Sequence, residues 1–390
     1  VAAAVAAHTT AYGLAFAQCE DDPGTMKELL LMNRGRLASV QGVEGAPIDF
    51  LVKLFRSREI VQEKYETDLQ PATRALCEAY AEGVNHYFAL NPHREIDVVL
   101  PVTGIDIVVG FVFKSPFFFG LDKTITELMG DERPMAVSEK TARNNSTENT
   151  AGWFSHDLPI GSNTFAVSPR RTPDKKTHLA INSHQPWTGP VAWYEAHLHS
   201  EEGWNMVGGA FPGVPLILHG HNEDLGWAHT VNSPDLVDIY VLEMNPDNPD
   251  QYRFDDKWLD LEIGEVEVLV KLWGPISFNK KLEVAYSVHG PVIRRPHGVY
   301  AIRYAGYGDI GQVEQWYQMN HATNMDEFMT AMRTQRLASF NVGYADKEGN
   351  IGYFYNALLP MRAPGYDWKK YLPGNTSETL WEDYLPFDEL

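Results

Sequence analysis

The chain has 390 residues, with 32 Lys and Arg against 52 Asp and Glu, for a formal net charge of −20. This acidity argues against a general nucleic-acid binder and against adhesion to anionic lipid, both of which need a basic surface. Hydrophobic residues make up 44% of the chain, enough for a substantial core in two lobes or one large multilayered domain. No stretch approaches the roughly 20 apolar residues of a membrane-spanning helix.

The cysteine content and the two ends of the sequence narrow the class further. Cys19 and Cys77 are the only cysteines, which excludes a disulfide scaffold and a zinc site of the CxxC type. The chain opens at Val1 with VAAAVAAHTTAYGLAFAQ and no preceding basic segment, so we interpret this run as a helix and not as a signal peptide. The sequence stops at PFDEL without a clear ending, and we expect a fragment at both ends.

Residues 1–129 are predicted to be mostly helical. In the segment ALCEAYAEGVNHYF, Leu76, Tyr80, Val84 and Tyr87 recur at helical spacing and form one apolar stripe. Core packing is the expected role of such a stripe. Residues 131–158 then change character: the run SEKTARNNSTENTAG is polar and has almost nothing to bury, as is typical of a linker or an exposed loop.

From Ser162 onward the pattern becomes rich in β-strands. Short β-branched or alternating runs recur in TFAVS, THLAI, WYEAHLH, VDIYVLE, EVEVLVKL and LEVAYSV. The turn signals SPRRTPDKK, PWTGP, PGVP and NPDNPD separate strands, and helical periodicity returns in MDEFMTAMRTQRL. Helices followed by many strands and a further helix predict an α+β fold with a layered sheet core.

The step Gly161–Ser162–Asn163 lies between the polar linker and the first predicted strand. By itself this step is typical of a turn. If the Gly161–Ser162 bond breaks, however, Ser162 carries a free α-amino group with a pKa of about 7.7–8. One residue then supplies both the nucleophile and its base, as in hydrolases that use an N-terminal residue.

Other polar positions leave functional and structural interpretations open. His184 follows a predicted strand, where it could orient a substrate or simply complete a turn. The backbone N–H of Val231 follows the end of a strand, a position typical of an oxyanion-hole donor. Asp235, Asp238 and the distant Glu127 could bind calcium through hard oxygen atoms, or they could belong to solvated acidic turns.

Several segments taken together resemble the penicillin acylase family of N-terminal-nucleophile (Ntn) hydrolases. GSNTFAV, INSHQPW, GGAFPGVP, GWAHTV, DLVDIY, YSVHGPVI, YADKEGNIGYF and PFDEL occur in the order of that family. AYGLAFAQCEDD and AYAEGVNHYF resemble its α-chain, except that Cys19 stands where a small residue is more usual. The HTV version of the oxyanion segment is more similar to acyl-homoserine-lactone and aculeacin-type acylases than to penicillin G acylase.

This resemblance implies an architecture: an αββα sandwich, with residues 1–129 as a helical α-chain region, 130–161 as a spacer peptide and 162–390 as the first part of a β-chain. Self-cleavage between Gly161 and Ser162 would give an α/β heterodimer in the periplasm or outside the cell. The implied substrate is a small N-acyl amide: an acyl-homoserine lactone, a lipopeptide or a β-lactam side chain. No organic cofactor, nucleic acid or membrane partner is expected.

The resemblance also implies a role for individual residues. Ser162 would be the nucleophile, with His184 aiding its amine and Val231 N–H binding the oxyanion. A second oxyanion donor, an asparagine, is expected beyond Leu390. An acyl pocket is expected from Gln185, Trp187, Phe211 and Leu218, and a structural calcium site from Glu127, Asp235, the carbonyl of Val237 and Asp238.

Two other classes compete with this reading. The histidines are dense enough to indicate a metallohydrolase, and His197 and His199 would share one face of a strand. The sequence has neither an HxHxDH nor an HExxH run, which weighs against that class. The other alternative is a non-catalytic binding relative that keeps the fold, and self-cleavage would distinguish it from an enzyme.

Overall fold

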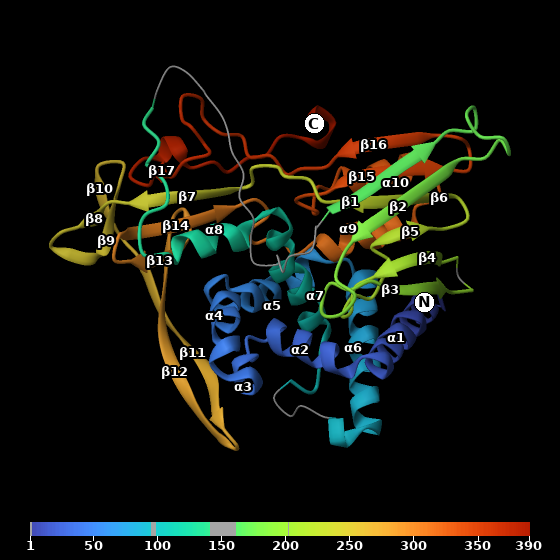
Figure 1. The fold of residues 1–390 in the computed structure, drawn as a ribbon, viewed down its shortest axis with the longest axis horizontal. Helices are drawn as coiled ribbons and strands as arrows, with labels where there is room; N and C mark the ends of the chain where they lie inside the picture. Colours follow the sequence, from blue (N-terminus) through green and yellow to red (C-terminus); the bar gives the residue numbers. More distant parts are fainter. Residues whose placement is uncertain (1, 95–98, 141–160, 202) are drawn as a thin grey trace.

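Helices dominate the first third of the molecule in a computed structural model that describes residues 2–94, 99–140, 161–201 and 203–390 (Figure 1). The α-helices are α1 (Ala2–Asp21), α2 (Pro23–Asn33), α3 (Ala38–Gln41), α4 (Ala46–Leu54), α5 (Ser57–Asp68), α6 (Pro71–Leu90), α7 (Gly104–Lys114) and α8 (Leu121–Leu128). Short 3₁₀ turns cover η1 (Gly42–Gly45), η2 (Pro92–Arg94) and η3 (Ser115–Phe119). The helical prediction is therefore confirmed, while most of the predicted linker lies outside the described residues.

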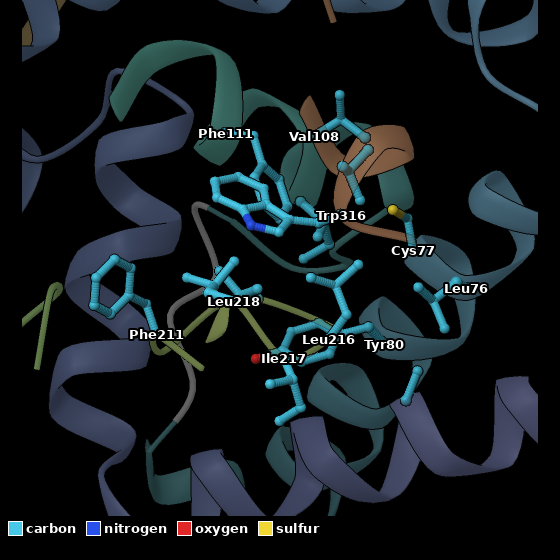
Figure 2. Close-up of a cluster of buried hydrophobic side chains, with 14 of the residues drawn as sticks. Leu76, Cys77, Tyr80, Val108, Phe111, Phe211, Leu216, Ile217, Leu218 and Trp316 are labelled. Carbon is cyan, nitrogen blue, oxygen red and sulfur yellow. The ribbon is translucent and has the colours of Figure 1, made fainter. Parts of the chain in front are cut away.

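Helix α6 shows how the sequence pattern becomes packing. Pro71 occupies the first turn, where its missing N–H leaves no intrahelical bond unmade. Leu76, Tyr80, Val84 and Tyr87 are all buried, so their stripe is core, as predicted. These residues pack against α1, α7 and the strands beyond them in the largest apolar cluster of the described residues, part of which is shown in Figure 2.

Helix α7 is fixed at its start by a buried charge cluster. Thr103 and Asp106 form a capping box: the side chain of each residue accepts a hydrogen bond from the backbone N–H of the other. Both oxygens of Asp106 also bind Arg34, at 2.8 Å each, and Arg58 pairs with the same carboxylate. Because its start is held in this way, α7 presents its last residues to the sheet in a defined position.

The main sheet has six antiparallel strands in the order β16-β15-β6-β5-β4-β3. They are β3 (Tyr194–His199), β4 (Asn205–Ala210), β5 (His219–His221), β6 (Leu225–Thr230), β15 (Asn341–Asp346) and β16 (Ile351–Tyr355). Every residue of β6 is buried, because layers cover both faces of the sheet. On one face Trp227 and Tyr344 contact Phe328 of α10 (Met325–Met332).

A two-stranded ribbon covers the other face of this sheet. It consists of β1 (Gly161–Val167) and β2 (His178–His184), which pair antiparallel and lie against β6 and β15. Thr164 of β1 sits over Gly343 of β15, where a Cβ atom would lie 2.7 Å from the Thr164 hydroxyl. Glycine at this position therefore lets the ribbon approach the sheet. Helix, sheet and ribbon give three stacked layers (Figure 1).

A second six-stranded sheet has the order β11-β12-β13-β14-β7-β17, with β17 parallel to β7. Its strands are β7 (Val237–Leu242), β11 (Glu262–Trp273), β12 (Ile276–Ser287), β13 (Gly290–Arg295), β14 (Gly298–Tyr304) and β17 (Leu372–Pro373). Helices α4 and α8 pack on it through their own apolar cluster. The long β11–β12 hairpin runs down one side of the helical region and packs on α3, where Ala38, Val268 and Val270 are buried together (Figure 1).

The remaining elements are small, and two of them, β9 and α9, differ from what the sequence predicted. A three-stranded sheet joins β8 (Met244–Asn245), β9 (Asn248–Phe254) and β10 (Lys257–Asp260), and the short turns η4 (Ser377–Thr379) and η5 (Phe387–Glu389) follow later. The NPDNPD turn is shorter than predicted because β9 begins at Asn248. Helix α9 (Gln312–His321) was not predicted.

The described residues include no single helix whose length and apolar character suffice to cross a membrane. One sharply bent pair, Gly104–Phe119 with Leu121–Leu128, meets those criteria by length and composition.

Candidate active site

Ser162 lies at the edge of a cavity of about 60 Å³ between the ribbon, the main sheet and the end of α7. It is the second residue of β1, opposite Ser183 of β2 in the ribbon register. Of the predicted site residues, Gln185, Phe211, Leu218 and Val231 line the same cavity. The fold therefore brings five predicted residues together from segments that lie far apart in the sequence.

Val231 stands directly after β6, which ends at Thr230, as the sequence predicted. Within the described part of the chain its N–H donates no hydrogen bond, and its side chain is 38% exposed. The loop is held by Asn232, whose side chain accepts from Phe340 N at 2.9 Å and donates to the carbonyl of Asn356 at 2.9 Å. A fixed backbone N–H without a partner, at the wall of a cavity, fits an oxyanion donor.

Phe340 closes the wall beside Val231 in a strained conformation. Its φ is 109°, in the region that favours glycine, and its ring lies 5.3 Å from that of His229 and 5.3 Å from that of Phe118. Such strain persists only where surrounding contacts enforce it, and it concentrates at functional sites. Here the Asn232 hydrogen bond and the aromatic contacts supply that enforcement.

The floor of the cavity is aromatic, with Phe211 buried and Trp193 half-buried. Trp193 stacks on Phe211 with ring centroids 4.2 Å apart and lies against His219 at 4.0 Å. Figure 2 shows Phe111, Phe211, Leu218 and Trp316 in the adjoining apolar cluster. A pocket with a mostly apolar lining and a few polar groups is the usual form of a small-molecule site.

Two buried histidines add polar groups that carry no charge at neutral pH. Burial lowers the pKa of His219 to about 4, and burial together with His219 lowers the pKa of His229 to about 3. The indole N–H of Trp316 donates to Nε2 of His229 at 3.1 Å. Nδ1 of His219 and the indole N–H of Trp193 are buried without a hydrogen-bond partner in the described residues.

Two predicted residues do not reach the cavity. Trp187 follows β2 in a turn, its side chain is 98% exposed, and it is absent from the cavity lining. His184 ends β2, and its Nε2 lies 3.1 Å from the amide nitrogen of Asn182 and 3.4 Å from that of Asn163. Ser183, its neighbour, lines the cavity instead.

Two lining residues, His219 and His229, entered the sequence analysis only among the histidines of the metallohydrolase alternative. The other lining residues were missed: Gly110, Phe111, Lys114, Ser115, Phe118, Ser183, Trp193, Val214, Thr230, Trp316 and Phe340. The FKSPFFF run at the end of α7 and the His229–Thr230 step inside GWAHTV were the available signals. Neither can be assigned to a site without knowing that α7 docks beside β6.

The predicted calcium ligands are arranged around an arginine. Arg362 donates from Nε to Asp238 at 3.0 Å and from Nη1 to Asp235 at 3.0 Å. Trp381 donates to the same Asp238 oxygen at 2.6 Å, whereas Asp238 Oδ1 is buried without a partner in the described residues. Burial raises the pKa of Asp238 to about 7, although the charge of Arg362 acts to lower it.

The other two predicted ligands lie on neighbouring elements: Val237 begins β7, and Glu127 sits on α8. Burial raises the pKa of the Tyr371 phenol, and the nearby charge of Glu127 adds to this rise. Among the described residues no three His, Cys, Asp or Glu side chains gather as a metal site. The histidine cluster of a metallohydrolase is therefore not formed there. One unpaired carboxylate oxygen fits a hard cation, but the pairing of both aspartates with Arg362 does not.

Taken together, the fold and the cavity define an α+β protein with a serine beside an apolar pocket, whose wall holds a backbone N–H that has no partner in the described part of the chain. The sequence model of the Penicillin amidase family matches residues 3–390. The chain therefore belongs to the penicillin amidase family.

Named relatives fall into two groups. The acyl-homoserine lactone acylase PvdQ of Pseudomonas fluorescens Pf0-1 is 28% identical over 75% of this chain and 39% of its own length. Penicillin G acylase of Escherichia coli is 27% identical over 59% of this chain and 27% of its own length. The solved thermostable penicillin G acylase from Alcaligenes faecalis aligns with a TM-score of 0.51 at 29% identity, covering 58% of this chain and 40% of the other. The chain thus spans less than half the length of these relatives.

Proposed function

We propose that this protein hydrolyses the amide bond of small N-acylated molecules, with Ser162 as an N-terminal nucleophile released by cleavage after Gly161. The observation that carries the proposal is the position of Ser162 at a cavity whose wall contains the free N–H of Val231. Membership of the penicillin amidase family and the acylase names of the relatives support it.

Maturation comes first in this proposal. The hydroxyl oxygen of Ser162 attacks the carbonyl carbon of Gly161, the C–N bond breaks, and the acyl group moves from nitrogen to oxygen. Water then hydrolyses the resulting ester, which frees the Ser162 amine and leaves a carboxylate on Gly161. Gly161 has no side chain to hinder the approach.

Turnover follows the same chemistry on the substrate. The amine of Ser162 takes the hydroxyl proton while Oγ attacks the amide carbon, and the negative oxygen of the tetrahedral intermediate accepts a hydrogen bond from Val231 N–H. The proton passes to the leaving amine, and water hydrolyses the acyl-serine ester. His184 is the proposed support for the Ser162 amine from the paired end of β2.

The test of the nucleophile uses the protein expressed from its complete gene. The large product of cleavage should begin SNTFAV on N-terminal sequencing. Ser162→Ala should abolish both cleavage and hydrolysis across a panel of acyl-homoserine lactones, acylated peptides and penicillins. Ser168→Ala, directly after the far end of β1 and outside the cavity lining, is the matched control and should retain both. Wild-type hydrolysis by Ser162→Ala would refute the proposal.

The oxyanion role of Val231 has its own matched pair of variants. Val231→Pro removes the N–H and should lower kcat by about 10²–10³, the usual effect of losing one oxyanion donor. Val231→Ala keeps the N–H and should retain most of the activity. Tryptophan fluorescence and thermal unfolding establish that both variants are folded. Equal rates for the two folded variants would remove Val231 from the mechanism.

We also propose a structural calcium ion, which the resemblance to the family implies. The ion would hold the two chains of the cleaved heterodimer together. Asp238 Oδ1, Asp235 and the Val237 carbonyl would hold it, with Glu127 reaching across from α8. Carboxylate and carbonyl oxygens suit calcium better than softer metals. Elemental analysis of the purified protein should find calcium and no zinc; stoichiometric zinc alone would contradict the assignment. A periplasmic or secreted location is proposed with it.

A further inference from the structure

Lys114 is the one charged side chain in the cavity lining among the described residues. It is the last residue of α7, and none of the Asp and Glu residues that the structure describes lines the same cavity. Neither a hydrogen bond nor an ion pair involves its amine in the described part of the chain, and its neighbours in the wall include Phe111, Phe118 and Trp316. A half-buried cation without a counter-ion beside aromatic rings is costly to maintain unless a ligand neutralises it.

The charge of Lys114 persists at neutral pH. Burial lowers the pKa of its amine to about 8, which still leaves it mostly protonated at pH 7. His219 and His229, the other titratable side chains of the lining, are neutral there because burial holds the pKa of each at about 4 or below. The indole N–H of Trp193 offers an uncharged donor without a described partner in the same lining.

We propose that Lys114 makes this cavity selective for acyl groups that end in a carboxylate. The inference rests on the proposed function, since it takes the cavity as the site of the acyl group. The carboxylate of the substrate forms a charge-assisted hydrogen bond with the Lys114 amine, and the Trp193 indole adds a second donor. The apolar floor holds the methylene chain between this carboxylate and the amide carbon next to Ser162. The expected substrates are therefore monoamides of short dicarboxylic acids.

The experiment compares amides of one chromogenic amine in the protein expressed from its complete gene. Each of the succinyl, glutaryl and adipoyl amides is paired with an amide of the same amine whose acyl chain ends in an isopropyl group in place of the carboxylate. Shape is then constant within a pair, and the three lengths allow for the depth of the site. At pH 7 the carboxylate member of at least one pair should have the higher kcat/KM, by about 10- to 100-fold, as expected for a hydrogen bond between charged groups.

Variants of Lys114 test whether this side chain causes the preference for a terminal carboxylate. Lys114→Met should erase or reverse it while isopropyl amides are still hydrolysed, and Lys114→Arg should keep a part of it. Lys123→Met, on α8 and outside the cavity lining, is the control and should leave the ratio unchanged. In the wild type the ratio should fall as pH rises through about 8, because the amine loses its charge. Titration of the Ser162 amine affects both members of a pair and cancels in the ratio.

Two failures can be told apart. Ser162-dependent hydrolysis with no carboxylate preference, or with a preference that Lys114→Met leaves intact, overturns the role of Lys114 and leaves the proposed function standing. If no amide is hydrolysed, binding of the N-propyl monoamides of succinate, glutarate and adipate and of their isopropyl counterparts is followed through tryptophan fluorescence, to which Trp193 and Trp316 of the lining contribute. Tighter binding of the carboxylate that Lys114→Met abolishes then supports the role of Lys114 although the proposed reaction fails; equal binding overturns it.

Discussion

Asp106 and Asp238 are both buried and both contact arginine, yet their surroundings differ. The Asp106 carboxylate has Arg34 on both oxygens, Arg58 beside it, and the Thr103 N–H and hydroxyl at 2.9 and 3.0 Å. Asp238 has Arg362 and Trp381 on one oxygen, while its other oxygen has no partner among the described residues.

The pKa shifts of the two carboxyls follow this difference. Burial acts to raise the pKa of Asp106, but the hydrogen bond from Arg34 and the charges of Arg58 and Arg34 outweigh burial and hold the pKa below its ordinary value. Burial dominates at Asp238, and the pKa is raised to about 7. A fully paired cluster is built for stability, whereas an unpaired buried oxygen marks a place where a further group can bind.

The largest effect is expected at Asp106. Asp106→Asn removes the negative charge and leaves Arg34 and Arg58 without their shared carboxylate at the start of α7, which should lower the free energy of unfolding by about 3–5 kcal/mol. Urea unfolding measures the change. Asp250→Asn, in an exposed pair with Arg294, is the control and should cost less than about 1 kcal/mol. Similar losses in the two variants would show that the Asp106 cluster is not a special source of stability.

Acid should weaken the same cluster. A carboxyl whose folded pKa lies below its unfolded value stabilises the fold above the unfolded pKa of about 3.9, and this contribution is lost as pH falls through the folded pKa. Between pH 5 and pH 3, the midpoint temperature of thermal unfolding should therefore fall more steeply in the wild type than in Asp106→Asn. Parallel curves would contradict a lowered pKa at Asp106.

The sequence predicts the parts of this molecule that depend on local pattern. The α+β class, the helical first third, the buried stripe of α6 and the position of Val231 just after a strand follow from periodicity and turn residues. Ser162, Gln185, Phe211 and Leu218 were expected at one site, and they line one cavity. The resemblance to the penicillin acylase family carried that expectation; their spacing alone did not.

What the sequence does not predict depends on docking between distant elements. In the sequence Lys114 is a single basic residue within an apolar run, and no neighbouring residue in the chain indicates a ligand. Its place in the cavity follows only from how α7 meets the ribbon and β6. Arg362 lies 124 positions after Asp238, and no local pattern links the two. Trp187 was expected in the pocket for its aromatic type, whereas the PWTGP turn leaves its side chain exposed.

A variant of Arg362 tests directly whether Asp238, unlike the fully paired Asp106, has room for a further ligand. Arg362→Leu removes the cation and leaves Asp238 buried with Trp381 as its remaining donor, so the variant should lose about 1–3 kcal/mol in calcium-free buffer. If calcium binds here, millimolar calcium should restore much of that loss, because a ligand that binds only the folded state stabilises it. Magnesium at the same concentration is the matched salt control. A variant that calcium does not stabilise would assign the cluster to Arg362 alone.

The smallest effect is expected at Asp235, whose carboxylate is 42% exposed and shares Arg362 with Asp238. Asp235→Asn removes one partly solvated ion pair and leaves the Arg362–Asp238 contact in place, so the free energy of unfolding should change by less than about 1 kcal/mol without calcium. With calcium present the expectation differs, because a metal site loses a charged ligand when Asp235 becomes an amide. The calcium-dependent rise in the unfolding midpoint should then be smaller in Asp235→Asn than in the wild type. An equal rise in both proteins would place any bound calcium elsewhere and leave Asp235 as an ordinary surface partner of Arg362.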